Sequence, residues 1–215
     1  LITPIDNEAP DGRMILPQQM AIRDVLDNNA INIVLKEDQV ENFIKNSGIK
    51  PRIAITDSQV FHKMKKIVPE DIPLTSFSIV FARMKGDFEY YKKGTPALDT
   101  LKDGDRVLIL ESCSHQVNCD DIGRFKLPNW ISKHSGKNIE FDIVAGLSKV
   151  EREMTDYALV VQCGGCMVTR KQLSSRLKPA VDADIPVTNY GLAIAWMNGI
   201  FERAIQPFEK EVLLK

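Results

Sequence analysis

The pattern that most constrains the fold is an alternation of short apolar runs with segments of helical periodicity. Residues 53–56, 106–111 and 157–161 are apolar runs of strand length, rich in β-branched residues. The segments between them have helical spacing and lack the two-residue turn signals of β-hairpins. Neighbouring strands joined by helical crossovers are parallel. We therefore predict an α/β chain with two small parallel-sheet domains and helical crossovers, Rossmann- or flavodoxin-like.

The composition changes between residues 84 and 103, where a polar and aromatic run interrupts the alternation. We place the domain boundary here, which gives domains at 1–92 and 93–215. In the first domain we expect strands at 31–35 and 53–56 and after Pro73, and helices at 17–29, 40–48, 58–68 and 78–83. In the second we expect strands at 106–111, 139–144, 157–161 and 186–188, and helices at 121–133, 169–181 and 190–205.

The charge balance excludes some functions. Among 215 residues, 28 Lys and Arg face 29 Asp and Glu, for a formal net charge of -1. A polybasic nucleic-acid surface is therefore not expected. Apolar runs are too short to span a bilayer, and the first residues do not read as a signal peptide. We expect a cytoplasmic protein, and the missing initiator Met suggests a piece of a longer one.

All four cysteines lie in the second half, and two of them directly follow expected strands. Cys113 comes just after 106–111, and Cys163 follows 157–161 by one residue. If these strands are neighbours, both thiols reach the same edge of the sheet, where ligands bind in such folds. Gly164 and Gly165 allow a tight turn that brings Cys166 toward the same centre. Thiolates near exposed backbone N–H groups suit a soft, anionic metal centre.

Several readings of this arrangement remain open. A C-x-x-C pair also occurs in thioredoxin-like redox sites and in zinc sites. The pairing with Cys113-x-His115 favours a metal, although the spacing alone does not separate zinc from an iron–sulfur cluster. His115 is the only histidine close to this site in sequence. Three cysteines and one optional histidine leave a coordination position open to exchange, as in metal sites that act on something.

These motifs together resemble those of a known family. Cys113-Ser114-His115 with Cys163-Gly164-Gly165-Cys166-Met167 is similar to the iron–sulfur motif of the [FeFe]-hydrogenase maturation factor HydF. The resemblance runs the length of the chain. It includes Ile2-Thr3-Pro4-Ile5-Asp6, residues 11–18, 55–61 and 74–79, Asp120-Asp121-Ile122-Gly123 and Pro186-Val187-Thr188-Asn189-Tyr190-Gly191.

The resemblance implies a three-part protein with a GTPase domain, a dimerisation domain and a domain that binds a [4Fe–4S] cluster. Such a protein acts as a scaffold and carrier for a transient di-iron subcluster precursor. It delivers the precursor to apo-[FeFe]-hydrogenase and meets the other maturation enzymes. The resemblance thus implies a homodimer with a cluster scaffold. The alternative is a zinc-binding or C-x-x-C thiol-redox interaction module.

The chain departs from the family pattern in two respects. It contains no G-x-x-x-x-G-K-[ST] phosphate loop, so we expect a cluster scaffold without GTP hydrolysis of its own. Gln162 stands where the family usually has a histidine. On the resemblance, Cys113, Cys163 and Cys166 are the fixed metal ligands, and His115 matches the cofactor-binding motif by position. The fourth ligand stays open among His115, Cys119, a carboxylate and an exogenous molecule, with Cys119 read as a bystander.

Overall fold

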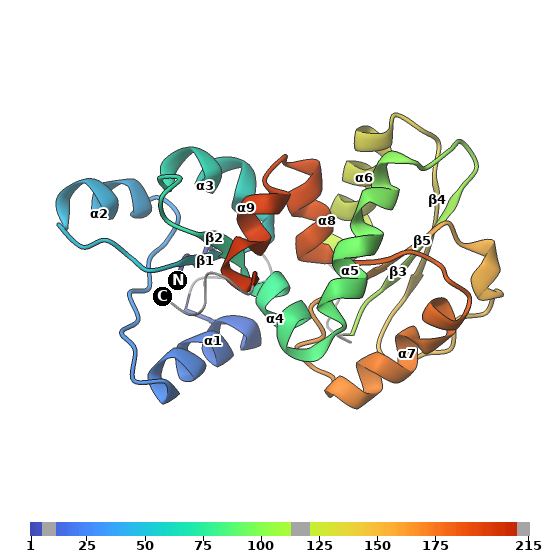
Figure 1. The fold of residues 1–215 in the computed structure, drawn as a ribbon, viewed down its shortest axis with the longest axis horizontal. Coiled ribbons are helices and arrows are strands. Elements are labelled where there is room, and N and C mark those ends of the chain that lie inside the picture. The colour runs from blue at the N-terminus through green and yellow to red at the C-terminus, as the bar shows by residue number, and fades with distance from the viewer. Residues whose placement is uncertain (6–11, 113–120, 210–215) are drawn as a thin grey trace.

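The computed structural model describes residues 1–5, 12–112 and 121–209. Among these residues the strands form two sheets, both parallel, with helices packed around them (Figure 1). The predicted α/β class with two small parallel sheets is therefore confirmed.

The larger sheet has the strand order β4-β3-β5-β6. Its strands are β3 (Arg106–Leu110), β4 (Glu140–Val144), β5 (Leu159–Gln162) and β6 (Val187–Asn189). The chain starts in the middle of this sheet, moves to one edge and returns to the other side of β3. This is the beginning of the flavodoxin-like order, and its topological switch point lies between β3 and β5. Leu110 pairs with Gln162 at the carboxyl ends of these two strands.

Apolar burial explains why β3 and β5 are central. Val107, Leu108 and Ile109 are fully buried, and so are Val160 and Val161 on the neighbouring strand. Strands covered on both faces are continuous apolar runs of this kind. The helices that pack around this sheet are α5 (Phe88–Gly94), α6 (Leu127–Ser135), α7 (Arg170–Asp182) and α8 (Tyr190–Met197), and α9 (Phe201–Ile205) follows α8.

The single helix predicted at 190–205 is wrong, because the structure divides it into α8 and α9. The break falls at Gly199, which has φ 66°. A left-handed residue of this type commonly ends a helix, and it turns the chain between the two. Sequence periodicity did not reveal the break because both helices contribute residues to the same core, among them Leu192 and Phe201.

The smaller sheet pairs β1 (Ala54–Thr56) with β2 (Leu74–Ser76). Around it lie α1 (Leu16–Asp27), α2 (Val40–Asn46), α3 (Phe61–Ile67) and α4 (Phe77–Lys85). Ile2 makes isolated bridges to Thr56 and to Leu35.

The strand predicted at 31–35 is also wrong, since only Leu35 takes part in a bridge. The segment runs beside the first residues of the chain, where Leu35 accepts a hydrogen bond from the N–H of Thr3 and donates one to Leu1. The bridge at Leu35 is not extended along the segment, and Ile31 is 89% exposed. The alternating apolar residues predicted a strand, but residues 31–34 form no strand in the structure.

The N-terminal part (α1 to α4) and the C-terminal part (α5 to α9) share one apolar core. Leu74 and Ile79 belong to the same buried cluster as Leu192 and Ile194. Helix α8 packs on α4, and α9 packs on β2, in the centre of the molecule (Figure 1). Helix α5 spans the expected boundary at 92/93, which stays a prediction.

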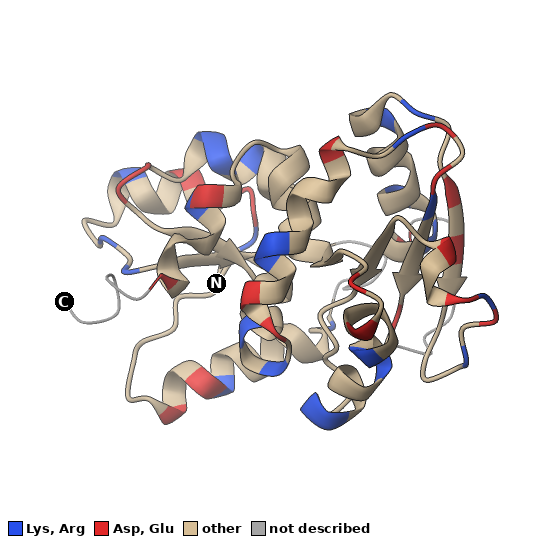
Figure 2. Cartoon of the chain, turned by 45° about the vertical axis from the view of Figure 1, so that its right-hand side comes forward, with Lys and Arg blue, Asp and Glu red and all other residues tan. Residues whose placement is uncertain are grey.

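Acidic and basic residues are interspersed over the helices of both parts (Figure 2). Within the described ranges, no helix combines the length and the apolar character needed to cross a membrane.

Candidate metal-binding site

The site begins where β5 ends. The N–H of Cys163 donates to the carbonyl of Leu110 at 2.9 Å, so the cysteine continues the pairing of β5 with β3 beyond the last strand residue. This is the carboxyl edge of the sheet at the switch point, where the loops that follow neighbouring strands diverge. The predicted position of Cys163 at the carboxyl end of a buried strand is confirmed.

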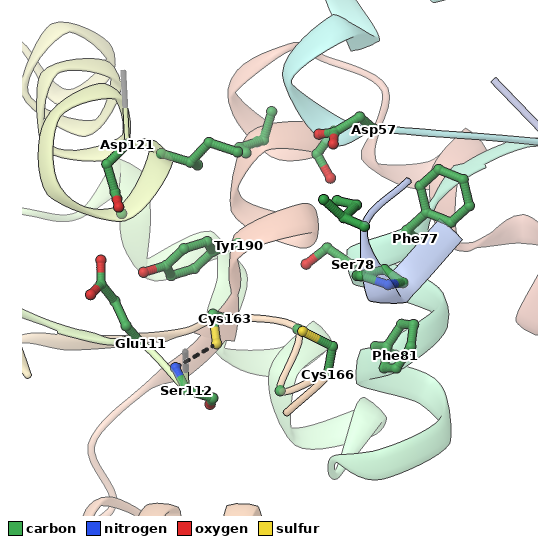
Figure 3. A pocket seen from close by; sticks show the side chains of 18 residues that line it. Asp57, Phe77, Ser78, Phe81, Glu111, Ser112, Asp121, Cys163, Cys166 and Tyr190 are labelled. Atoms are coloured by element: carbon green, nitrogen blue, oxygen red, sulfur yellow. Dashed lines mark hydrogen bonds between the residues drawn. The ribbon is translucent and has the colours of Figure 1, made fainter. Parts of the chain in front are cut away.

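The sulfur of Cys163 lies among hydrogen-bond donors. The backbone N–H of Ser112 donates to Cys163 Sγ at 3.0 Å (Figure 3), and Nε2 of Gln162 lies 3.4 Å from the same sulfur. Burial raises the pKa of the Cys163 thiol, and hydrogen bonds from Ser112 and from the backbone of Gly165 oppose that rise. The N–H groups thus partly offset the cost that burial imposes on an anionic sulfur.

The loop after Cys163 brings the second thiol to the same pocket. Gly165 has φ 67°, a left-handed backbone conformation that residues other than glycine adopt only at a cost in free energy. The turn is closed by the N–H of Val168, which donates to the carbonyl of Gly165 at 3.3 Å. Cys163 and Cys166 are both present as half-buried thiols, and both line the pocket (Figure 3). Helix α7 starts just after the loop, with Thr169 as its cap.

The Gln162 side chain links the carboxyl ends of β3 and β5. The residue is completely buried, and its Nε2 donates to Ser112 Oγ at 3.0 Å and to the Cys163 carbonyl at 3.2 Å. Asn189 Nδ2 donates to the Gln162 carbonyl at 3.2 Å, and Ser78 Oγ donates to Asn189 Oδ1 at 3.1 Å. Sequence reasoning treated Gln162 only as a missing ligand. A polar residue ending an apolar strand was the available signal.

Acidic residues form another wall of the pocket. Glu111 and Asp121 are 5% and 4% exposed, and both line the cavity (Figure 3). Arg124 Nε donates to Glu111 Oε2 at 3.1 Å, which neutralises one of the two carboxylates. Asp121 accepts a hydrogen bond from the Arg124 N–H and begins the helical turn at Ile122–Lys126.

Arg176 of α7 binds the carboxyl ends of β3 and β4. Its guanidinium donates to the carbonyl of Glu111 at 2.5 Å and to that of Val144 at 2.7 Å. Burial lowers the pKa of Arg176, and the nearby Cys163 is the first of the groups that raise it. A positive charge thus lies close to the thiol and favours its anionic form.

The pocket between the two parts encloses about 150 Å³. The N-terminal part supplies a mainly apolar wall, formed by Ile15, Pro17, Phe77 and Phe81 with Asp57, Ser58 and Ser78. In Figure 3 Phe77, Ser78 and Phe81 lie on one side of the two thiols, and Glu111 and Asp121 lie on the other. A site shared by both parts was not foreseen from the sequence, which had assigned the chemistry to the second domain alone.

The structure brings Cys163 and Cys166 together, whereas Cys113, His115 and Cys119 lie outside the described residues. Their predicted roles are therefore untested. Within the residues that are described, no group of three or more His, Cys, Asp or Glu could hold a metal ion. The two described thiols with their N–H donors and the adjacent positive charge nevertheless fit the chemistry of an anionic metal–sulfur centre.

Comparison with protein families gives two matches that cover most of the chain. Residues 1–86 match the hydrogen maturase F dimerization domain, and residues 89–207 match the hydrogen maturase F tetramerization domain. A comparison with curated proteins found no match. Both matched domains are named for self-association, which supports an oligomeric chain. The chain belongs to the hydrogen maturase F (HydF) family of hydrogenase maturation factors.

Proposed function

We propose that this chain is the scaffold and carrier part of hydrogenase maturation. It binds a [4Fe–4S] cluster, receives a di-iron precursor and delivers it to apo-[FeFe]-hydrogenase. The proposed fixed ligands are Cys113, Cys163 and Cys166, with His115 as a candidate for the remaining position. Scaffold chemistry belongs to residues 93–215 and pairing of two copies to residues 1–92, in the cytoplasm.

One observation carries the proposal: the Ser112 N–H bonds to Cys163 Sγ at 3.0 Å. Ser112 directly precedes Cys113 in the sequence. Ser112, the last described residue before Cys113, therefore lies beside Cys163, which supports Cys113 as a third ligand. A C-x-x-C redox pair acting alone does not require a third cysteine here. A cluster with three thiolate ligands does.

The donors around the site also favour an iron–sulfur cluster. Cluster sulfurs are stabilised by backbone N–H groups and nearby positive charge, and both surround Cys163. The Arg176 guanidinium and the Gly165 N–H perform this role without needing to move.

The adjoining cavity is the proposed place for the cargo. When bound, a cluster with one iron that lacks a fixed protein ligand supplies an exchangeable coordination position. The chain's own residues then confine the precursor, because Phe77 and Phe81 form an apolar wall opposite Cys163 and Cys166. Glu111, which is paired with Arg124, and Asp121 line another side of the same cavity.

Anaerobic reconstitution with iron and sulfide tests the proposal. The expected product is a brown protein that contains about four irons and four acid-labile sulfides per chain. A colourless protein that retains zinc would assign the site to the interaction-module class instead. A metal-free chain in which Cys163 and Cys166 cycle between dithiol and disulfide, with no need for Cys113, would assign it to thiol redox chemistry.

A further inference from the structure

The loop that carries the two thiols rests on helix α4 of the N-terminal part. A Cβ atom built on Gly164 would lie 3.6 Å from Cβ of Phe81 and 3.6 Å from Cα of Ser78, which is ordinary van der Waals contact. Ser78 and Phe81 are three residues apart and share one face of the helix. Lys85 follows on the same face one turn later.

Lys85 makes the most specific contact between α4 and this loop. Its Nζ lies 2.9 Å from the carbonyl oxygen of Gly165, 3.1 Å from that of Cys166 and 2.9 Å from that of Val168. An ammonium group has three donors and no acceptor, so these carbonyls use its whole hydrogen-bonding capacity. The Lys85 stem also brings Nζ to 5.3 Å from the centre of the Phe81 ring.

This contact has a consequence for the shape of the loop. Three carbonyls that converge on one cation must point to the same side of the turn, toward α4. Peptide planarity then directs the N–H groups of the same units, those of Cys166, Met167 and Thr169, away from α4. The Gly165 N–H, which is among the donors to Cys163 Sγ, belongs to the preceding peptide unit and is joined to the Lys85-bound Gly165 carbonyl through the Gly165 Cα, so holding that carbonyl restricts the orientation of this N–H.

We propose that Lys85 is a positioning residue for the metal-binding loop. It acts through the carbonyls of Gly165, Cys166 and Val168 and sets the directions in which Cys163 and Cys166 present their sulfurs. Through Lys85, a helix of the part matched to the dimerization domain controls the geometry of a site whose cysteines lie in the other part. This role deepens the proposed function. Only the measurement on the reconstituted protein depends on the proposed cluster, whereas the measurement on the metal-free chain does not.

The variant Lys85→Met tests this because it keeps the apolar stem and removes the three donors. The matched control is Lys65→Met. Lys65 Nζ also joins the two parts, by donating to the carbonyl of Asn198 at 2.7 Å, but it does so away from the cysteines. Both variants are first compared by circular dichroism and thermal melting.

The first measurement uses the metal-free chain and hydrogen–deuterium exchange of residues 163–168. We expect exchange in this loop to be about tenfold faster in Lys85→Met, with exchange in α7 unchanged, because the opening of the loop becomes easier. Lys65→Met should exchange as the wild type does in the loop. Equal loop exchange in all three proteins would overturn the proposal.

The second measurement follows reconstitution with iron and sulfide. We expect Lys85→Met to give an altered electron paramagnetic resonance spectrum of the reduced cluster and faster loss of iron to a chelator, while Lys65→Met matches the wild type. An unaltered spectrum and unaltered iron loss in Lys85→Met would overturn the positioning role. If no protein takes up a cluster but loop exchange still accelerates in Lys85→Met, the positioning role stands and the proposed cluster function fails.

Should Lys85→Met not fold, Lys85→Arg serves in its place. The planar guanidinium keeps the charge but does not match three converging carbonyls as a tetrahedral ammonium does. Faster loop exchange in Lys85→Arg than in the wild type would support the proposal. Unchanged exchange in this variant would contradict it.

Discussion

The backbone N–H of Ser112 donates a hydrogen bond to Sγ of Cys163, over a distance of 3.0 Å. The two residues are 51 positions apart in the sequence and meet because β3 and β5 are adjacent parallel strands that end at the same level. The contact makes the end of β3 part of the environment of the C-x-x-C loop. A substitution at either strand end is therefore expected to affect the same centre.

Replacing Cys163 by Ala should abolish cluster loading while the chain stays folded. The thiol lies at the end of β5, and a change from Cys to Ala removes little volume, so the expected loss of stability is about 1 kcal/mol. Iron and acid-labile sulfide are measured after anaerobic reconstitution, and folding is followed by circular dichroism. The control is Cys119→Ala, which should load as the wild type does. Full iron and sulfide content in Cys163→Ala would remove Cys163 from the ligand set.

Replacing Gln162 by Met should shift the midpoint potential of the bound cluster to a more negative value. The variant fills a similar volume but loses the Nε2 donor that lies 3.4 Å from Cys163 Sγ and 3.0 Å from Ser112 Oγ. Fewer hydrogen bonds to the sulfurs disfavour the reduced, more negative state. Potentiometric titration measures the shift, and Gln206→Met at the exposed start of the turn at Gln206–Phe208 is the control. A potential equal to that of the wild type would contradict the proposed role of Gln162.

The metal-free chain should lose stability in mildly alkaline solution because of Cys163. Burial raises the pKa of this thiol in the folded state, so the folded chain holds the proton more tightly than the unfolded chain. Its contribution is fully present below the unfolded pKa of about 8.5 and is lost as the pH rises toward the folded value. Burial and the Asp142 hydrogen bond raise the pKa of Tyr157 to about 12, which lies above this window.

The measurement is the urea midpoint of the metal-free chain at about pH 7.5 and about pH 9.5, compared with that of Cys163→Ala. The wild type should lose more stability over this interval than the variant. Parallel losses in both proteins would show that the Cys163 thiol does not cause the loss of stability at alkaline pH.

Much of the fold could be predicted because its signals are local. The strand-length apolar runs at 106–111 and 157–161 lie within one or two residues of β3 and β5, and the helix predicted at 169–181 lies within one residue of α7. Residues that directly follow neighbouring parallel strands lie at the same, carboxyl edge of the sheet. The position of Cys163 followed from this reasoning.

The other parts of the site depend on packing between distant segments, and the sequence holds no local signal for them. Ser78 and Lys85 are ordinary helix residues until α4 is placed against the C-x-x-C loop, some 80 residues later in the chain. The sequence pattern likewise could not show that β3 and β5 are neighbours, so the meeting of the two thiols could be predicted only if they were. The strand predicted at 31–35 was wrong for a related reason, because its pairing depended on a distant segment and only Leu35 forms a bridge.

Replacing Gly165 by Ala should damage the metal-binding loop beyond its effect on stability. Gly165 has φ 67°, and an added Cβ would lie 3.4 Å from Leu173, so the variant should lose about 1–2 kcal/mol of stability. The control is Gly136→Ala at the end of α6, where φ is 64° and a Cβ would meet open space. Both variants should be destabilised in urea by similar amounts, because they strain the backbone alike. Only Gly165→Ala should also lower cluster loading, since its turn directs Cys166 and supplies an N–H to Cys163. Equal loading in the two variants would mean that the left-handed turn serves the fold and not the site.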